Sequence, residues 1–340
     1  VADVGPDCVL CDLLNTIVYA PKGALMALDE YVEKDSIDLD QFYGPAVDEL
    51  RSGDNLYGIP LTVDTRIIFY NKDLLEEAGV DPASITDWNS LEEAAVKLTK
   101  WDGNVLEQSG FSMKDVGLFN NWIAQAGGQM IDDTTNPPTT AFNSEAGLTV
   151  LEYWNKLLNE DKVYQLGFED GLGGDGFKAG KVAMTFNGPW VLEQYKEAGL
   201  NFGVIGQPKG PSGDMHAMMG GFGLAIPNKA KHSDEAWEFS KWWSTQPENG
   251  VEFCKISGNR PANKAAAEDP YFADDDVFEV FTEAYTYAGI RSKVLGYSDV
   301  EGLALIPQLQ KYVAGEISAE EALANAQSQG DSILAEAAQQ

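Results

Sequence analysis

The sequence predicts an α/β fold, because segments with strand character and segments with helix character alternate along the chain. The chain has 340 residues, which is long for one domain and comfortable for two. Hydrophobic residues make up 44% of it and include eight tryptophans, so the chain can bury large cores rather than remain disordered.

The first elements follow from local patterns. Residues 7–11 have the apolar character of a buried strand, and residues 56–70 are rich in β-branched and aromatic side chains, which favour extended structure. Residues 73–78 form a short helical pattern that Gly79 ends. A strand followed closely by a helix is typical of α/β proteins.

Later helices are indicated by capping residues and apolar stripes. Leu91, Ala94, Ala95 and Leu98 share one helix face, and a second stripe runs through residues 148–158. The predicted N-terminal signals are Ser90 with Glu93, Ser233 with two acids behind it, Ser298 with Glu301, and Ser318 with Glu321.

The charge balance excludes some partners. The formal net charge is −31, so nucleic acid and anionic membrane surfaces are not expected to bind. The longest apolar stretch, residues 218–227, falls short of the ~20 residues that a membrane span needs. No targeting segment is visible in the sequence.

Several short motifs lack the context that their chemistry requires. Cys8 and Cys11 form a Cys-x-x-Cys pair inside a predicted strand, which favours two structural thiols over a zinc or redox site. Gly171, Gly173 and Gly176 match the dinucleotide fingerprint, but no apolar strand precedes them, which favours a surface loop. The sequence therefore predicts no metal and no cofactor.

Four segments together resemble the extracellular solute-binding proteins of carbohydrate ABC importers, the maltose-binding-protein-like family. They are YGIP with IFYNKDLL (57–60 and 68–75), FKAGKVAMTFNGPW (177–190), GGFGLAIP (220–227) and GNRPANK (258–264). They occur in the family's order and at its spacing, and the resemblance extends over essentially the whole chain.

The resemblance implies the type II periplasmic-binding-protein fold, with two hinge-linked lobes and a ligand in the cleft between them. The expected first lobe is 1–63 plus 222–265, and the expected second lobe is 66–220 plus 270–340. The family's first strand, helix and second strand have no counterpart upstream of residue 6, so we expect an incomplete first lobe and a fragment of a longer reading frame.

Aromatic rings that cover a sugar face, and carboxylates that bond vicinal hydroxyls, are the groups that a carbohydrate site needs. Trp190 matches the family's stacking tryptophan. Trp122 lies in a region that lines the cleft in relatives, with core packing as the alternative. Asp64 matches an acid that bonds sugar hydroxyls in relatives, or else pairs with Arg66. Asp12 ends a strand, where ligands bind in such folds, or caps a helix.

The remaining candidate residues concern the backbone and the cations. Gly221 and Phe222 resemble a hinge crossing at which the backbone can approach a ligand. Arg66, Arg260 and Arg291 fall in segments near the cleft of relatives, where a guanidinium could bind a phosphate or uronate, or form salt bridges. Trp88, Trp154, Trp237 and Trp243 are expected in the core.

The resemblance implies a binding protein without catalytic activity, a monomer outside the cytoplasm that delivers a mono- or oligosaccharide to the membrane permease of an importer. One alternative is a family member that binds glycerol phosphate or another anion. A second is a carbohydrate-active hydrolase, which would share an aromatic and acidic cleft, although the sequence offers no identifiable acid–base pair.

Overall fold

The computed structural model describes residues 5–339 and confirms the α/β class. The chain folds into two compact units, each built from two segments. Unit 1 comprises Val1–Thr65 and Met218–Leu295, and unit 2 comprises Arg66–Ala217 and Gly296–Gln340. No helix within the described range is long and apolar enough to cross a bilayer.

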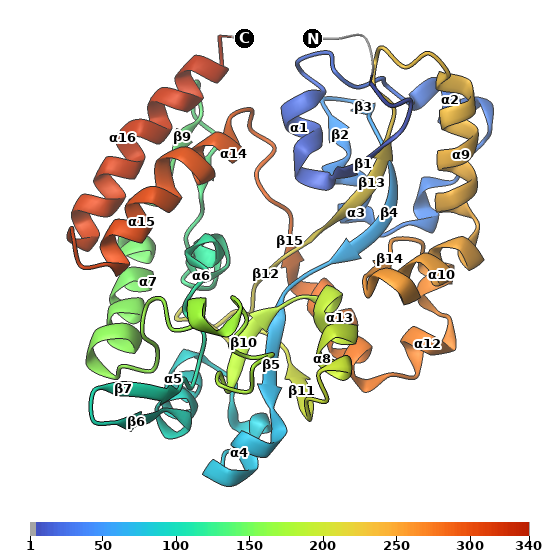
Figure 1. Ribbon diagram of the computed structural model, residues 1–340. Helices are drawn as coiled ribbons and strands as arrows, with labels where there is room; N and C mark the ends of the chain where they lie inside the picture. Colours follow the sequence, from blue (N-terminus) through green and yellow to red (C-terminus); the bar gives the residue numbers. More distant parts are fainter. Residues whose placement is uncertain (1–4, 340) are drawn as a thin grey trace. The chain divides into compact units, whose positions relative to one another are not determined.

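Unit 1 contains a four-stranded sheet in the order β1–β13–β4–β14, visible in Figure 1. Its strands are β1 (Val9–Asp12), β13 (Gly220–Ala225), β4 (Ile59–Asp64) and β14 (Arg260–Pro261). Strand β13 runs antiparallel to both β1 and β4, so β1 and β4 are parallel and end at the same edge of the sheet. Among the described residues β1 has a neighbouring strand on one side only.

Helices surround this sheet. Helices α2 (Asp29–Lys34) and α9 (Ser233–Thr245) contact each other through Tyr31, which stacks on Trp237 at 5.3 Å and donates a hydrogen bond to Asp234. The helices of unit 1 are α1 (Thr16–Tyr19), α2 (Asp29–Lys34), α3 (Gly44–Glu49), α9 (Ser233–Thr245), α10 (Pro247–Ser257), α11 (Lys264–Ala267), α12 (Pro270–Ala273) and α13 (Asp276–Tyr287). Short strands β2 (Arg51–Ser52) and β3 (Asn55–Leu56) pair with each other. Strand β12 (Ala217–Met218) lies where the chain passes from unit 2 to unit 1, and it pairs with β15 (Ala288–Gly289).

Unit 2 contains the sheet β10–β5–β11, in which both outer strands are antiparallel to β5. Phe69 of β5 contacts the rings of Phe177, Tyr195 and Phe202, which form an aromatic core on this sheet. The sheet strands are β5 (Ile67–Asn71), β10 (Met184–Asn187) and β11 (Phe202–Ile205), and the hairpin strands are β6 (Lys100–Asp102), β7 (Val105–Gln108), β8 (Ile131–Asp132) and β9 (Thr139–Thr140).

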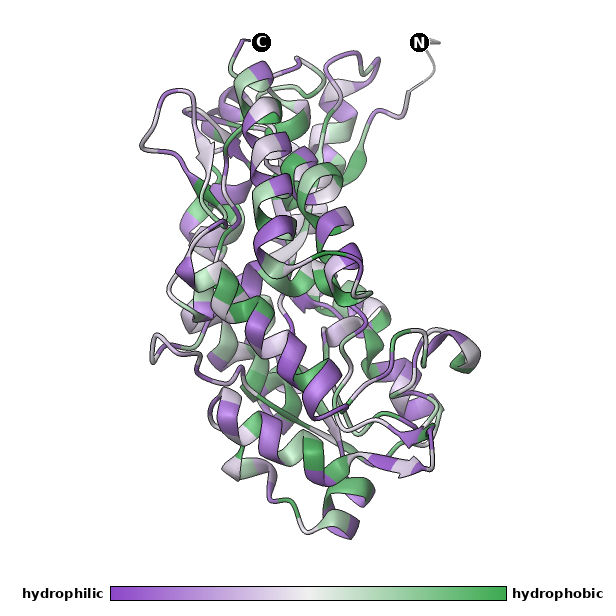
Figure 2. Cartoon of the chain, turned by 90° about the vertical axis from the view of Figure 1, so that its left-hand side faces the viewer, coloured by the Kyte–Doolittle hydropathy of each residue, from purple (hydrophilic) through white to green (hydrophobic). Residues whose placement is uncertain are grey.

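The longer helices of unit 2 are amphipathic, and Figure 2 shows apolar and polar residues interspersed along the helices of the chain. In α16 (Ala319–Ala337) the buried residues Leu323, Ala326, Gly330 and Leu334 recur every three or four positions, as helix packing requires. The helices are α4 (Lys72–Ala78), α5 (Trp88–Leu98), α6 (Phe119–Gln125), α7 (Glu145–Asn155), α8 (Leu192–Glu197), α14 (Tyr297–Asp299), α15 (Ile306–Val313) and α16 (Ala319–Ala337), with π-helical turns at Lys156–Glu160 and Val300–Leu305.

The helix-start predictions met with mixed results. The Ser318 capping box with Glu321 and the Gly79 end of α4 are confirmed. Helix α5 begins earlier than expected, because Asp87 rather than Ser90 is the N-cap and Ser90 returns the reciprocal bond. Ser233 is the first residue of α9 rather than its cap. Ser298 lies inside α14 and caps nothing, because the N-cap is Gly296.

The observed units differ from the expected lobe boundaries at residues 218–220 and 270–295, which were expected in the second lobe but belong to unit 1. The reason lies in α13. Tyr285 donates a hydrogen bond to the carbonyl oxygen of Val63 in β4, and its ring lies 6.1 Å from that of Tyr43. These long-range contacts attach α13 to the sheet of unit 1.

The tryptophans and cysteines complete the core assignment. Trp88, Trp154 and Trp237 are buried as expected, whereas Trp243 is only half-buried, against Phe239 and Phe253. All three cysteines are free thiols. Cys11 packs in the core with Leu25 and Ala225, and burial raises its pKa to about 11, so it is an inert thiol.

Candidate functional site

Two carboxylates that the sequence singled out lie at one edge of the unit 1 sheet. Asp12 ends β1 opposite Phe222, and Asp64 ends β4 opposite Gly220. Because both strands end at this edge, with the start of β13 between them, the fold brings together residues that are 52 positions apart in the sequence. Asp12 also caps the following turn by accepting a hydrogen bond from Leu14 N, so its alternative role as a cap is confirmed.

Glu49, at the end of α3, joins this edge and was not singled out from the sequence. Its side chain is buried, and neither carboxylate oxygen has a hydrogen bond within the described residues. Arg291 Nε lies 3.7 Å from Glu49 Oε1, and Arg291 Nη2 lies 3.6 Å from Asp12 Oδ1. Burial raises the pKa of Glu49 to about 7, opposed by Arg291 and assisted by the charges of Asp12 and Asp64.

Gly221 and Phe222 lie where β13 leaves this edge. Gly221 has φ +140°, and a Cβ there would come within 2.2 Å of the Thr62 carbonyl oxygen. Phe222 N donates to Thr62 Oγ1 at 3.2 Å, next to a β-bulge. The close approach of β13 to β4 therefore leaves no room for a side chain at position 221. Contact of this backbone with a ligand remains a prediction.

Unit 2 contains a separate cavity of about 190 Å³ next to β10. One wall is aromatic, from Phe186 and Trp190, and the others carry charged or polar side chains. The lining residues are Arg66, Ser112, Lys114, Asp115, Leu118, Asp175, Thr185, Phe186, Asn187 and Trp190. An aromatic face beside convergent hydrogen-bonding groups is typical of sites for small polar ligands.

Trp190 is positioned by the turn that precedes it. A Cβ at Gly188 would lie 2.1 Å from the Trp190 ring, so only glycine allows the indole to fold over this turn. The Arg66 guanidinium lies 5.4 Å from the ring centroid, which is within cation–π distance. The indole is half-buried, and so part of it remains available to a ligand.

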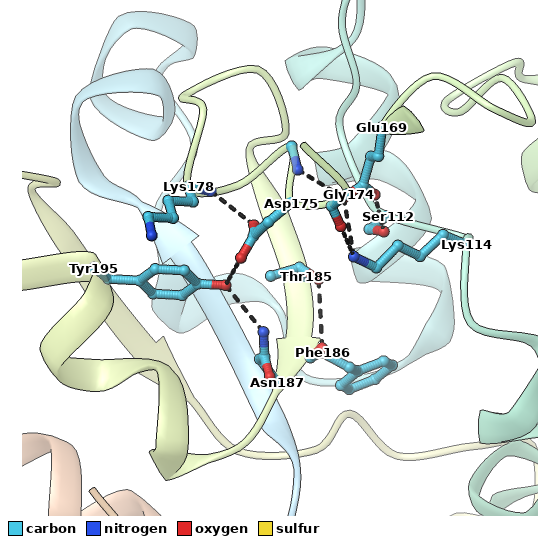
Figure 3. Close-up of polar contacts among 11 residues, drawn as sticks. Ser112, Lys114, Glu169, Gly174, Asp175, Lys178, Thr185, Phe186, Asn187 and Tyr195 are labelled. Atoms are coloured by element: carbon cyan, nitrogen blue, oxygen red, sulfur yellow. Dashed lines mark hydrogen bonds and ion pairs between the residues drawn. The ribbon is translucent and has the colours of Figure 1, made fainter. Parts of the chain in front are cut away.

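Asp175 is held in place by two neighbours, as Figure 3 shows. Its Oδ1 accepts from Lys178 N at 2.8 Å, and its Oδ2 accepts from the Tyr195 hydroxyl at 3.2 Å. The same hydroxyl accepts from Asn187 Nδ2 at 2.9 Å. Because these bonds fix both carboxylate oxygens and the amide, the cavity wall is preorganised.

The glycine-rich loop at 171–176 folds around the buried carboxylate of Glu169 (Figure 3). Glu169 accepts hydrogen bonds from Ser112 Oγ at 2.5 Å and Gly176 N at 2.7 Å, and forms an ion pair with Lys114 at 3.3 Å. Lys114 also donates to the Gly174 carbonyl oxygen. The loop is therefore an ordered wall, and Glu169 joins it to the segment that supplies Ser112 and Lys114.

Trp122 and Arg260 belong neither to the carboxylate group of unit 1 nor to the lining of the unit 2 cavity. Trp122 is 3% exposed and packs against Trp88, Tyr153 and Phe186, so we assign it to the core, its alternative role, rather than to ligand contact. Arg260 is 4% exposed and lies in unit 1 beside Phe272. Its place on β14 puts it on the far side of β4 from β1 in the sheet order.

The sequence did not single out Glu49, Lys114, Asp175, Phe186 or Asn187 as site residues. Phe186 and Asn187 stand in the segment that also carries Trp190, and strand alternation could have indicated which of them to examine. Nothing in the sequence around Glu49 distinguishes it from the other acids. No group of metal-ligating side chains occurs in the described part of the chain.

Comparison with known proteins matches residues 2–279 to the family of bacterial extracellular solute-binding proteins. The chain belongs to this family. A putative binding protein of Brucella abortus (strain 2308) is 25% identical over 94% of this chain and 77% of the relative. The galactooligosaccharide-binding protein of Bacillus subtilis is also 25% identical, over 83% of this chain and 66% of that protein.

Solved structures agree with the predicted fold. An ABC substrate-binding protein of Listeria monocytogenes in complex with cycloalternan has a TM-score of 0.87 at 22% identity, and covers 96% of this chain and 84% of its own. The protein CpMnBP1 with mannobiose bound has a TM-score of 0.84 at 26% identity, over 97% of this chain and 85% of its own. The two-lobed periplasmic-binding-protein fold is therefore confirmed. The family and these relatives are binding proteins rather than enzymes.

Proposed function

We propose that the chain is the extracytoplasmic substrate-binding component of an ABC importer and that its ligand is a mono- or oligosaccharide. The observation that carries this proposal is the unit 2 cavity, in which the Trp190 ring lies beside an acid and an amide fixed by other residues. An indole covers the C–H face of a pyranose, and Asp175 and Asn187 can bond its hydroxyls. The relatives named for galactooligosaccharide and mannobiose support the ligand class.

The charges of the cavity favour a neutral ligand. Lys114 is already paired with Glu169, and the other cation, Arg66, lies over the Trp190 ring. Asp115 and Asp175 line the same space and would repel a phosphate or uronate. A family member for an anionic ligand would need more uncompensated cations than this cavity offers.

In unit 1, we propose that Asp12 and Asp64 bond sugar hydroxyls and that Arg291 orients Asp12. The support is their common sheet edge and the 3.6 Å separation between Arg291 Nη2 and Asp12 Oδ1. Membrane permease subunits would be the protein partner, and the chain would act as a monomer without catalytic activity.

The test is calorimetric titration with a panel of neutral mono- and oligosaccharides, sugar phosphates and uronates, with product analysis of the same samples. Saturable binding of a neutral sugar without product is expected. Tight binding of a sugar phosphate and of no neutral sugar would show that the natural ligand is anionic rather than neutral. Turnover at ~1 per second or faster, a rate typical of enzymes, would exclude a pure binding protein.

A further inference from the structure

Arg260 is a buried cation that has no carboxylate partner among residues 5–339. Its side chain is 4% exposed, and no acidic oxygen in the described residues lies within 4.0 Å of the guanidinium. Its Nε has no hydrogen-bond partner there, and Nη1 makes only a long bond of 3.5 Å to the Phe278 carbonyl oxygen. A buried charge is costly unless it is paired, so this arginine requires a counter-charge. In a chain with 54 acids, the lack of one at this position is informative.

The rings around Arg260 fix its orientation. The guanidinium carbon lies 5.9 Å from the Phe272 ring and 5.8 Å from the Phe278 ring, which contact each other at 5.1 Å. These rings belong to α12 and α13, which follow β14 in the chain (Figure 1). Aromatic packing of this kind covers the faces of a guanidinium, whereas the N–H groups at its edge suit a planar or spherical anion.

Arg260 lines a cavity of about 490 Å³ within unit 1. The other lining residues are Tyr43, Lys264, Ala267, Glu268, Phe272, Ala273, Glu279 and Thr282. Lys264 adds a second positive charge at the cavity, although its Nζ also donates to the Asp40 carbonyl oxygen. Glu268 and Glu279 line the same space and would repel an anion of high charge. Asp12, Glu49, Asp64 and Arg291 do not line it, so it is distinct from the proposed carbohydrate site.

We propose that this cavity binds a small monovalent anion, a halide or a short carboxylate, with Arg260 as its principal ligand. The guanidinium N–H groups donate to the anion and Lys264 adds long-range attraction. The Phe272 ring and the methyl groups of Ala267 and Ala273 provide an apolar wall for the alkyl part of a carboxylate. The anion supplies the counter-charge that no described carboxylate provides within 4.0 Å of the guanidinium.

Crystals of the wild-type chain soaked in bromide provide a direct test that needs no variant. An anomalous difference peak within hydrogen-bond distance of the Arg260 guanidinium is expected, and acetate at high concentration should displace it. Absence of a peak at this position, in crystals where bromide is bound elsewhere, would overturn the proposal.

Thermal unfolding in chloride and in acetate tests the site in solution and distinguishes the two classes of anion. The melting temperature of the wild type should rise with saturation, by about 3 °C at ten times the dissociation constant. Arg260→Met should lose this saturable rise. Arg51→Met is the matched control, because Arg51 is a half-exposed arginine of the same unit that lies 4.0 Å from Asp29 and does not line the cavity.

Each protein is measured in the same salt solutions, so general screening affects wild type and variants alike. If the melting temperature rises more in acetate than in chloride at equal concentration, the site binds carboxylates. If it rises more in chloride, the site binds halides. An identical salt response in wild type and Arg260→Met would contradict the proposal. If Arg260→Met does not fold, the bromide experiment on the wild type decides.

Discussion

Replacement of Trp190 by alanine is the sharpest perturbation of the proposed carbohydrate site. The half-buried indole forms an aromatic wall of the unit 2 cavity and has the Arg66 guanidinium 5.4 Å from its ring centroid. If a sugar covers the remaining exposed face, Trp190→Ala removes roughly 1.5–3 kcal/mol of apolar burial from the complex. This corresponds to a loss of affinity from about tenfold to over a hundredfold.

The effect on folding should be much smaller. The free protein loses the cation–π contact with Arg66, worth about 0.5–1 kcal/mol at a partly exposed site. Calorimetric titration of the best sugar should therefore show weakened binding, while the melting temperature falls by no more than a few degrees. Trp101→Ala is the control, because Trp101 is also partly exposed in unit 2 but does not line the cavity.

Two outcomes would refute this reasoning. Unchanged affinity in Trp190→Ala would show that the ring does not contact the sugar. Equal losses of affinity in Trp190→Ala and Trp101→Ala would show a general destabilisation rather than a lost stacking contact.

Three further predictions concern the core, the pH dependence and the motion of the chain. Trp122→Ala should destabilise the fold by about 3–5 kcal/mol in urea unfolding, because it leaves a cavity in an aromatic core, and an effect below about 1 kcal/mol would place Trp122 outside the core. The pKa of Glu49 is raised from 4.5 to about 7 in the folded chain, so between these pH values the folded state holds a proton that the unfolded state has lost. The Glu49 carboxyl therefore contributes at most about 3 kcal/mol to the free energy of unfolding. This contribution is present below pH 4.5 and is lost as the pH rises to 7. The difference in unfolding free energy between wild type and Glu49→Gln should therefore change between pH 4.5 and pH 7. A difference that does not depend on pH would contradict this assignment. Finally, if the lobes close on the ligand as the sequence resemblance implies, small-angle scattering should show a smaller radius of gyration with saturating sugar, and an unchanged radius would argue against closure.

The sequence by itself determined those features that depend on neighbouring residues. Gly79 ends α4 in the left-handed conformation, and Ser318 with Glu321 starts α16, because each involves groups within a few positions of one another. The strand of residues 67–71 and the segment around Trp190 were recognisable for the same reason. Alternation of such elements was sufficient to predict an α/β fold.

Only the tertiary structure decided which distant side chains meet and how deeply each is buried. Glu49 and Asp12 lie 37 positions apart in the sequence, yet both carboxylates are within 4 Å of the guanidinium of Arg291, which follows Glu49 by 242 positions. Trp122 and Trp190 carry the same indole, yet one packs inside an aromatic core and the other lines a cavity. Burial and charge pairing are sums over contacts from many segments, so a residue's identity and its immediate neighbours do not specify them.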